Sequence, residues 1–316
     1  MKLSKENYLK LIRAAFSLIV ITAMFYASSK LNESEIIFPE VAALLLGGWI
    51  NKKEPWTISK PRMCVLMSVG SLAGMLLARS SMPFAVKVLL GFIFIAFFLI
   101  STRTTLYPVI SSCILPIFLH TTSFVYPIVV TTLVLIVALG QKLFEATGLR
   151  EKEIFTPVQL RNPQLIKMWI LRTAVFFIVA AAPFIFNKIL FVAPPLIVTY
   201  AEFTNPKFAL HKYWFRTLIV IFSASILGAL GRYFFCINFN VPAFIIIFFS
   251  AIILLILMHF LKLYFPPAGA VLMLPYLLQT NALLPYPVQI LIGASILIFA
   301  AKIVAWIIKE KILSTK

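Results

Sequence analysis

A lysine, two adjacent prolines and a glycine stand close together in the C-terminal half of the chain. Lys262 precedes Pro266 and Pro267, Gly269 follows, and the residues after them are apolar. Paired prolines fix φ and remove two backbone donors, so a preceding helix stops there and a new one can begin. A helix that begins within a membrane presents unpaired N–H groups, which attract anions. We therefore expect these four residues to contribute to an anion-binding site.

A similar stretch in the N-terminal half carries Arg103, Tyr107 and Pro108, with Ser111 and Ser112 one turn further on. Pro108 would begin a second helix in the same way, and the two serines add hydroxyl donors. We expect the two stretches to frame one small anion between the halves of the molecule. The alternative is that the prolines only kink helices and that the two basic residues are interfacial anchors.

Two titratable residues in apolar surroundings are candidates for proton coupling. Glu40 follows a proline in an apolar segment, where a buried carboxyl usually faces a cavity or a partner. An interfacial position in the first turn of a helix is an equal alternative for this acid. His259 lies one turn before Lys262 and is a candidate proton relay, although an interfacial histidine is the favoured interpretation.

Polar residues also follow a proline pair in the second half of the chain. Thr199 and Tyr200 come after Pro194 and Pro195, and both are candidates for lining a solute path. Glu202 is next to a basic loop, so we expect its side chain to be exposed to solvent.

Residues for enzyme chemistry do not occur in a recognisable arrangement. The sequence has no Gly-rich phosphate loop, no HExxH and no GxSxG motif, and its ten acidic residues lie mostly in loops. The three cysteines, Cys64, Cys113 and Cys236, lack the spacing of a zinc or disulfide framework. We therefore predict that the chain is not an enzyme and has no catalytic residue, metal or cofactor.

Composition predicts the fold class. Hydrophobic residues make up 62% of the 316-residue chain and charged residues only 12%, and the hydrophobic residues form many separate blocks. This indicates an all-α, polytopic helical membrane protein with membrane lipids as partners. The chain has a net charge of +18, and in a membrane protein such an excess of basic residues normally lies in the cytoplasmic loops. Nucleic acid is therefore not an expected partner. A homo-oligomer is compatible with the sequence.

Twelve apolar segments are predicted, six on each side of a polar central stretch, and in each half the second and fifth are short. The second segment reaches roughly 22 Å, less than the roughly 30 Å of a hydrocarbon core, so it either crosses as part of a discontinuous helix or dips in and returns. The segments lie near 9–28, 36–50, 61–78, 83–101, 107–120, 124–140, 167–187, 191–202, 215–235, 241–261, 265–278 and 286–308.

The distribution of basic residues favours full crossings. If all twelve segments cross, the basic loop 51–62 lies on the same side as the N-terminus, the central stretch and the C-terminus. If the short segments return, that loop lies outside, against the positive-inside tendency. We therefore expect an integral plasma (inner) membrane protein with both termini cytoplasmic.

Matching residues in the two halves indicate an internal duplication. Arg103 and Pro108 lie 159 positions before Lys262 and Pro267, and other pairs share nearly the same offset. The predicted organisation is a first membrane repeat over 1–140, a basic cytoplasmic linker over 141–165 and a second, parallel repeat over 166–316. The further pairs are Arg13 and Arg172, Pro116 and Pro275, Arg62 and Arg216, Gly74 and Gly228, and Tyr126 and Tyr286.

The second half resembles the HPP family of integral membrane proteins, which is named for a His-Pro-Pro motif. Residues 265–270, Phe-Pro-Pro-Ala-Gly-Ala, match that motif except that Phe265 replaces the histidine, and residues 102–108 of the first half keep part of its context. The resemblance implies a transport protein, and some plant members are associated with nitrite movement. A weaker likeness is to aromatic-acid or fusaric-acid exporter-type membrane proteins.

Two functions follow from these observations. The first is a transporter or permease for a small solute, most simply an anion such as nitrite or a small organic acid, with a path between the two repeats. The second is a non-transporting membrane protein, either a lipid-modifying enzyme or a membrane scaffold. A polar cavity at mid-depth between the halves would favour transport, and a tightly packed apolar interface would favour a scaffold.

Overall fold

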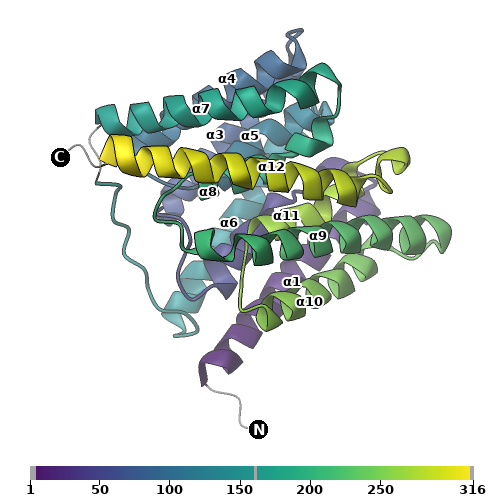
Figure 1. The fold of residues 1–316 in the computed structure, drawn as a ribbon. Helices are drawn as coiled ribbons and strands as arrows, with labels where there is room; N and C mark the ends of the chain where they lie inside the picture. The colour runs from purple at the N-terminus through teal and green to yellow at the C-terminus, as the bar shows by residue number, and fades with distance from the viewer. Residues whose placement is uncertain (1–4, 160–161, 314–316) are drawn as a thin grey trace.

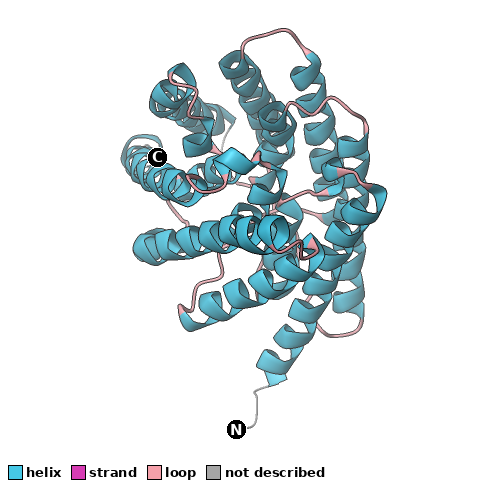
Figure 2. Ribbon diagram, turned by 90° about the vertical axis from the view of Figure 1, so that its right-hand side faces the viewer, coloured by secondary structure: helices cyan, strands magenta, loops and turns pink. Residues whose placement is uncertain are grey.

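A computed structural model describes residues 5–159 and 162–313, and this part of the chain is built from helices without a strand (Figures 1 and 2). The fold is therefore all-α, as predicted. The α-helices are α1 (Lys5–Leu31), α2 (Glu40–Leu45), α3 (Lys60–Arg79), α4 (Phe84–Thr102), α5 (Pro108–Leu119), α6 (Val125–Ala146), α7 (Asn162–Ile185), α8 (Pro194–Phe203), α9 (Trp214–Leu230), α10 (Ala243–Phe260), α11 (Pro267–Met273) and α12 (Tyr286–Ile307).

Eight helices within the described residues are long and apolar enough to cross a membrane: α1, α3, α4, α6, α7, α9, α10 and α12. The helical span that contains α9 is longer than α9 itself and runs from Ala209 to Asn238. Their outward faces carry large apolar side chains; Phe97, Ile178 and Phe299 are 64%, 74% and 69% exposed. Apolar surface of this extent is unfavourable in water and suits contact with lipid. These helices indicate a membrane protein.

The four short helices α2, α5, α8 and α11 form the interior of the bundle. Every residue of α2, α8 and α11 is buried, and only the last residue of α5 is partly exposed. Helix α2 packs on α11 and α5 packs on α8, while the long helices surround them (Figure 1). A π-helical turn, Leu46–Ile50, continues α2, and a 3-10 turn, Leu274–Leu277, continues α11.

Several loops meet at one end of the bundle, which we call the linker end. It comprises loop 51–59, residues 103–107, the segment 147–159 and loop 204–213. Thr105 N–H donates to the carbonyl of Thr57 at 3.2 Å, and Val158 N–H donates to the carbonyl of Arg103 at 3.0 Å. Loop 51–59, residues 103–107 and segment 147–159 are therefore joined at this end.

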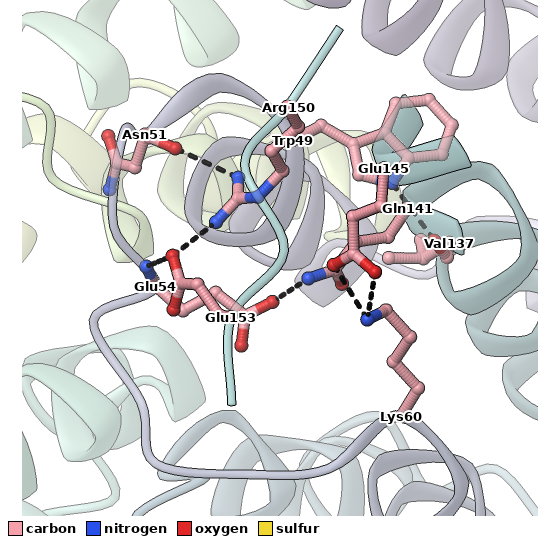
Figure 3. A network of polar contacts seen from close by, with 9 residues as sticks. All are labelled: Trp49, Asn51, Glu54, Lys60, Val137, Gln141, Glu145, Arg150 and Glu153. Atoms are coloured by element: carbon pink, nitrogen blue, oxygen red, sulfur yellow. Dashed lines mark hydrogen bonds and ion pairs between the residues drawn. The ribbon is translucent and has the colours of Figure 1, made fainter. Parts of the chain in front are cut away.

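A network of polar contacts attaches segment 147–159 to loop 51–59 (Figure 3). Arg150 donates to the carbonyl of Asn51 at 2.8 Å and forms an ion pair with Glu153 at 2.9 Å. Glu153 also accepts a hydrogen bond from the N–H of Glu54 at 2.9 Å, and the Glu54 carboxylate accepts from Gln141 of α6. Because Arg150 is buried, this network fixes the central segment instead of leaving it as a solvated tether.

Two further contacts fix the same loops against α6 (Figure 3). Lys60 forms an ion pair with Glu145 at 2.7 Å, with both side chains largely buried. The indole N–H of Trp49 donates to the carbonyl of Val137 at 2.9 Å. Its ring fills the notch at Gly140, where a Cβ would lie only 2.2 Å from the indole. Glycine is therefore needed at this close approach.

Candidate anion-binding site

A pocket with a volume of about 420 Å³ lies at the linker end, between the two halves of the chain. Helix α4 and the start of α5 form one wall, α7 and loop 204–213 form another, and segment 147–159 covers it. We call it the Arg172 pocket. Its lining residues are Thr57, Leu99, Arg103, Thr104, Thr105, Tyr107, Thr156, Pro157, Val158, Gln159, Leu165, Met168, Trp169, Arg172, Asn205, Pro206 and Lys207.

The charges of the Arg172 pocket have a single sign. Arg103, Arg172 and Lys207 contribute three cations, and no Asp or Glu is among the lining residues. Hydroxyl and amide groups from the threonines, Gln159 and Asn205 add neutral hydrogen-bonding groups. Cationic groups without internal carboxylates create a positive potential that favours an anion.

Arg172 is the most buried cation of the pocket, at 3% exposure. Its guanidinium lies 5.0 Å from the ring centroid of Trp169 and 5.8 Å from that of Tyr107, so aromatic faces stabilise the charge. The Nε atom of Arg172 is buried and has no hydrogen-bond partner. A buried donor on a charged group is costly to leave unpaired, and a carboxylate or oxyanion ligand would satisfy it.

Local backbone geometry brings Arg103 to this pocket. Arg103 ends α4 in the left-handed conformation, with φ of 51°, and thereby turns the chain toward α5. The turn is fixed by Thr57, whose N–H donates to the Thr105 hydroxyl at 2.7 Å. Tyr107 then precedes Pro108, the first residue of α5. The predicted juxtaposition of Arg103 with Tyr107 at a helix start is present.

The helix starts do not offer the bare amide groups that we expected. At α5, Ile110 N–H donates to the carbonyl of Tyr107 at 2.9 Å. At α11, Ala268 N–H donates to Phe265 at 3.2 Å and Gly269 N–H donates to Pro266 at 3.1 Å. Tight i to i−3 turns satisfy these donors. Any attraction of anions must therefore come from side chains.

Three residues of α5 that were predicted to belong to the site lie outside the Arg172 pocket. Pro108, Ser111 and Ser112 are buried in the bundle interior and do not line the Arg172 pocket. The Ser112 hydroxyl donates to the carbonyl of Val109 in its own helix at 2.9 Å. Ser111 instead donates to the carboxylate of Glu40.

The second-half stretch is also outside the pocket. Lys262 is exposed and ends its turn with φ of 51°, matching Arg103, whereas Pro266 and Pro267 are buried. Gly269 lies against Ala42, because a Cβ there would be 2.8 Å from the Ala42 side chain. These residues pack α11 onto α2, and Lys262 does not join Arg103 around one ligand.

The remaining polar candidates of the second half have local partners. Thr199 donates to the carbonyl of Pro195 within α8 at 2.9 Å, and Tyr200 donates to the carbonyl of Arg172 at 2.9 Å. Tyr200 thus supports the helix that carries Arg172 instead of facing a path. His259 is exposed, with Nδ1 3.2 Å from the hydroxyl of Tyr264, which agrees with the interfacial alternative.

Two carboxyl groups lie in the interior. Glu40 is 1% exposed at the start of α2; one oxygen accepts from Ser111 and the other has no partner. Glu202 is also 1% exposed, so the expectation that it faces solvent was wrong. Its Oε1 accepts from the indole of Trp56 at 2.9 Å, and its Oε2 has no partner. Loop 51–59 covers Glu202, a long-range contact that adjacent sequence does not reveal.

A second pocket of about 390 Å³ lies beside the network of Figure 3, and its charges are mixed. Its lining residues include two acids, Glu54 and Glu153, and two lysines, Lys60 and Lys142. Burial raises the pKa of Glu54 to about 7, although the hydrogen bond from Gln141 opposes this shift. Paired opposite charges leave little net field, so this pocket is a weaker anion site than the Arg172 pocket.

Arg172, Lys207 and Trp169 were not identified as site residues from the sequence. A signal existed for the first, because Arg172 falls inside a predicted span, where an ionisable residue is a functional-site hypothesis. Lys207 and Trp169 carry no comparable signal, since a loop lysine and an interfacial tryptophan are ordinary.

Nothing similar to this chain is found among protein-family models, curated proteins or solved structures. The site is therefore interpreted from its own geometry and charge.

Proposed function

We propose that the protein is a membrane transporter or permease for a small anion, with a path between the two halves of the chain that begins at the Arg172 pocket. The observation that carries this proposal is the set of three cations without a lining carboxylate, at a junction of both halves. Arginine suits such a role because its planar guanidinium pairs with carboxylates and oxyanions in a fixed geometry. A small organic acid or a nitrite-like ion fits this chemistry.

We further propose that the chain consists of two parallel six-segment repeats, each with short second and fifth segments. Packing supports this organisation: α3 packs on α5 and α6, and α9 packs on α11 and α12. Helix α4 packs on α7 of the other half, and α10 packs on α1. Repeats of this kind place binding sites between the repeats near the middle of the membrane, and the Arg172 pocket, between the two halves at the linker end, would be the entrance to such a site.

Matched side-chain contacts support the same organisation. Arg62 donates to the carbonyl of Thr102 at 3.3 Å, and Arg216 donates to the carbonyl of Leu261 at 3.5 Å. Each arginine lies in the first turn of the third helix of its half and caps the fourth helix with a charge-assisted contact. Contacts this alike are expected of two copies of one ancestral unit.

In our proposal the linker end faces the cytoplasm and the protein lies in the plasma (inner) membrane. The basic residues of loop 51–59, segment 147–159 and loop 204–213 support this orientation through the positive-inside tendency. Membership of the HPP family remains part of the proposal and rests on residues 265–270. Lipids and a small anion are the expected partners.

Glu40 is proposed as a coupling residue. Its carboxyl group lies in the bundle interior with a hydroxyl donor on one oxygen and no partner on the other. An ionisable group in this position is expensive to keep and is usually functional in a membrane protein. Helix α2, which it begins, packs on both α5 and α11, so its protonation would act on helices from both halves.

The alternative is a non-transporting membrane protein, and one observation favours it. Among the described helices, the cavity bounded by α1, α2, α10 and α11 is only about 20 Å³ and is lined by apolar side chains apart from Ser17. Close packing of this kind is expected of a scaffold. A transporter requires that this interface open during its cycle, as alternating access demands.

Flux measurements in liposomes test the proposal. Purified protein is reconstituted, and uptake of nitrite, formate and benzoate is compared for the wild type, Arg172→Gln and Lys188→Gln. Lys188 is an exposed cation at the opposite end, so its substitution matches the charge change outside the pocket. We expect saturable uptake of at least one anion that falls about tenfold or more in Arg172→Gln only. Uptake of none of the three, or uptake insensitive to Arg172, would overturn the proposal.

A further inference from the structure

The carboxyl group of Glu202 is covered by loop 51–59, which belongs to the other half of the chain. Its Oε1 accepts one hydrogen bond, from Trp56, and its buried Oε2 has no partner. A buried carboxylate with a single donor is costly, and access of water removes much of that cost. The charge of Glu202 is therefore linked to whether Trp56 stays in place.

No nearby group balances a charge on Glu202 in the described structure. Helix α11 and the 3-10 turn Ile189–Val192, both packed on α8, contain no titratable side chain. The other neighbouring elements have charged or titratable residues near the linker end. None of these residues forms an ion pair or hydrogen bond with Glu202 in the described structure. These are Tyr107 directly before α5, Lys302 on α12, Lys207, His211, Lys212 and Tyr213 on loop 204–213, and Lys52, Lys53 and Glu54 on loop 51–59.

Trp56 holds loop 51–59 against the bundle. Its side chain is 5% exposed, and its ring lies over Gly47, where a Cβ would be 2.5 Å from the indole. The glycine at this position therefore provides the space that the ring occupies. Release of Trp56 would free the loop from both Gly47 and Glu202.

Glu202 connects to the Arg172 pocket along two routes. Thr57, directly after Trp56, lines the pocket and exchanges two hydrogen bonds with Thr105. On the other side, Asn205 and Lys207 follow Glu202 within five positions and line the same pocket. A movement of the Trp56 loop would therefore remove part of the pocket wall.

We propose that Glu202 is a proton-binding site that controls the docking of loop 51–59, so that a proton and an anion bind at the linker end together. The proton moves between the carboxyl oxygen of Glu202 and water. With the proton bound, Trp56 stays docked and the pocket is complete; after its release, water enters and the loop opens. The first part stands alone, and the link to an anion rests on the proposed function.

Reciprocal coupling follows from this arrangement. If protonation of Glu202 favours the complete pocket, an anion in the pocket must favour protonation of Glu202 by the same free energy. Above the titration range, one-proton linkage weakens anion binding by up to about tenfold per pH unit. Such a linkage would make a proton the partner of the transported anion.

Amide hydrogen exchange of the 51–59 peptide tests the proton site. Glu54 on the same loop also titrates, so every variant carries Glu54→Gln. Exchange is measured in lipid nanodiscs from about pH 5 to about pH 9 and corrected for the intrinsic rate at each pH. We expect exchange to accelerate about tenfold or more as pH rises, because proton release opens the loop.

Variants separate Glu202 from other causes. Glu202→Gln keeps an acceptor for Trp56 and cannot ionise, so the loop should stay protected at every pH. Glu40→Gln makes the same change at the other buried acid and should keep the acceleration. Trp56→Phe keeps an aromatic ring without the donor and should exchange quickly throughout. Exchange independent of pH with Glu202 present, or equal acceleration in Glu202→Gln, would overturn the proposal.

Anion uptake is measured in the same variants to separate the two proposals. Weaker uptake at high pH with Glu202 present, and loss of that dependence in Glu202→Gln, supports the coupling. If the loop responds to pH through Glu202 but no anion is taken up, the proton site stands and the proposed function fails. If uptake is observed with equal pH dependence in Glu202→Gln, the proposed function stands and the coupling fails.

Discussion

The hydroxyl of Tyr126 donates a hydrogen bond to the backbone carbonyl of Ser112 at 2.9 Å, which ties α6 to the buried helix α5. In the second half, Tyr286 of α12 makes the same contact with Val271 of α11 at 2.8 Å. Both tyrosines are buried, so each hydroxyl has lost its contact with water. Helices α5 and α11 are thus held by one polar contact that is repeated in both halves.

Removing either hydroxyl should destabilise the bundle by a similar amount. Tyr126→Phe and Tyr286→Phe each leave a buried carbonyl without this donor, so we expect each to lower the free energy of unfolding by about 1–2 kcal/mol. Denaturant unfolding in mixed micelles measures the change. Tyr8→Phe, at a 57% exposed site, is the control and should change little. A loss confined to one half would contradict the proposed equivalence.

Two glycines permit the closest approaches of long helices to short ones. A Cβ at Gly74 would lie 2.0 Å from the carbonyl oxygen of Cys113, and one at Gly228 would lie 2.1 Å from that of Leu272. Gly74→Ala and Gly228→Ala should each lower stability by about 3 kcal/mol, because backbone must move to accept the methyl group. Thermal unfolding measures this loss.

Gly48→Ala is the matched control for these substitutions. A Cβ there would meet only Gln141 Oε1 at 3.5 Å, an ordinary contact distance. We expect little change in the midpoint of unfolding. Equal tolerance of alanine at positions 48, 74 and 228 would show that the helices are not as closely packed as described.

The ion pair between Lys60 and Glu145 should contribute more to stability than the pair between Lys52 and Glu6. Side chains of the first pair are 17% and 8% exposed, whereas those of the second are 63% and 60% exposed. Lys60→Met leaves a largely buried carboxylate unpaired, with an expected loss of roughly 3 kcal/mol. Lys52→Met should be close to neutral, because water screens exposed pairs. Unfolding at two salt concentrations distinguishes the pairs.

Glu54 should make stability fall as pH rises through the range in which it titrates. Burial raises the pKa of Glu54 from 4.5 to about 7 in the folded protein. Between these values the folded state binds more protons than the unfolded state, so unfolding becomes easier as pH increases. In Glu54→Gln this part of the pH dependence should disappear. A wild-type profile that rises over that range would contradict the assignment.

The helical class was predictable because long apolar blocks dominate the chain. Two short helices were also predictable: the expected segments 107–120 and 191–202 correspond to α5, Pro108–Leu119, and α8, Pro194–Phe203. Prolines made this possible, since Pro108 and Pro194 fix where each helix begins.

The site was harder to predict because it depends on contacts between distant residues. Arg103 and Tyr107 were identified, but Arg172 joins them from 69 positions beyond Arg103, and the sequence gives no measure of that proximity. Glu202 was assigned to solvent because a basic loop follows it, and the tryptophan that covers it lies in the other half. The first backbone N–H groups of a helix were expected to be unpaired, but tight turns at the starts of α5 and α11 give them acceptors.

Tryptophan emission gives the most direct test of the Arg172 pocket, because Trp169 lies 5.0 Å from the Arg172 guanidinium. Phosphate, formate and acetate are titrated at constant ionic strength, and the signal of Trp169 is obtained by subtracting that of Trp169→Phe. We expect a saturable change for at least one anion that is lost in Arg172→Gln and kept in Lys188→Gln. A response that does not saturate, or that persists without Arg172, would show that the pocket does not bind these anions.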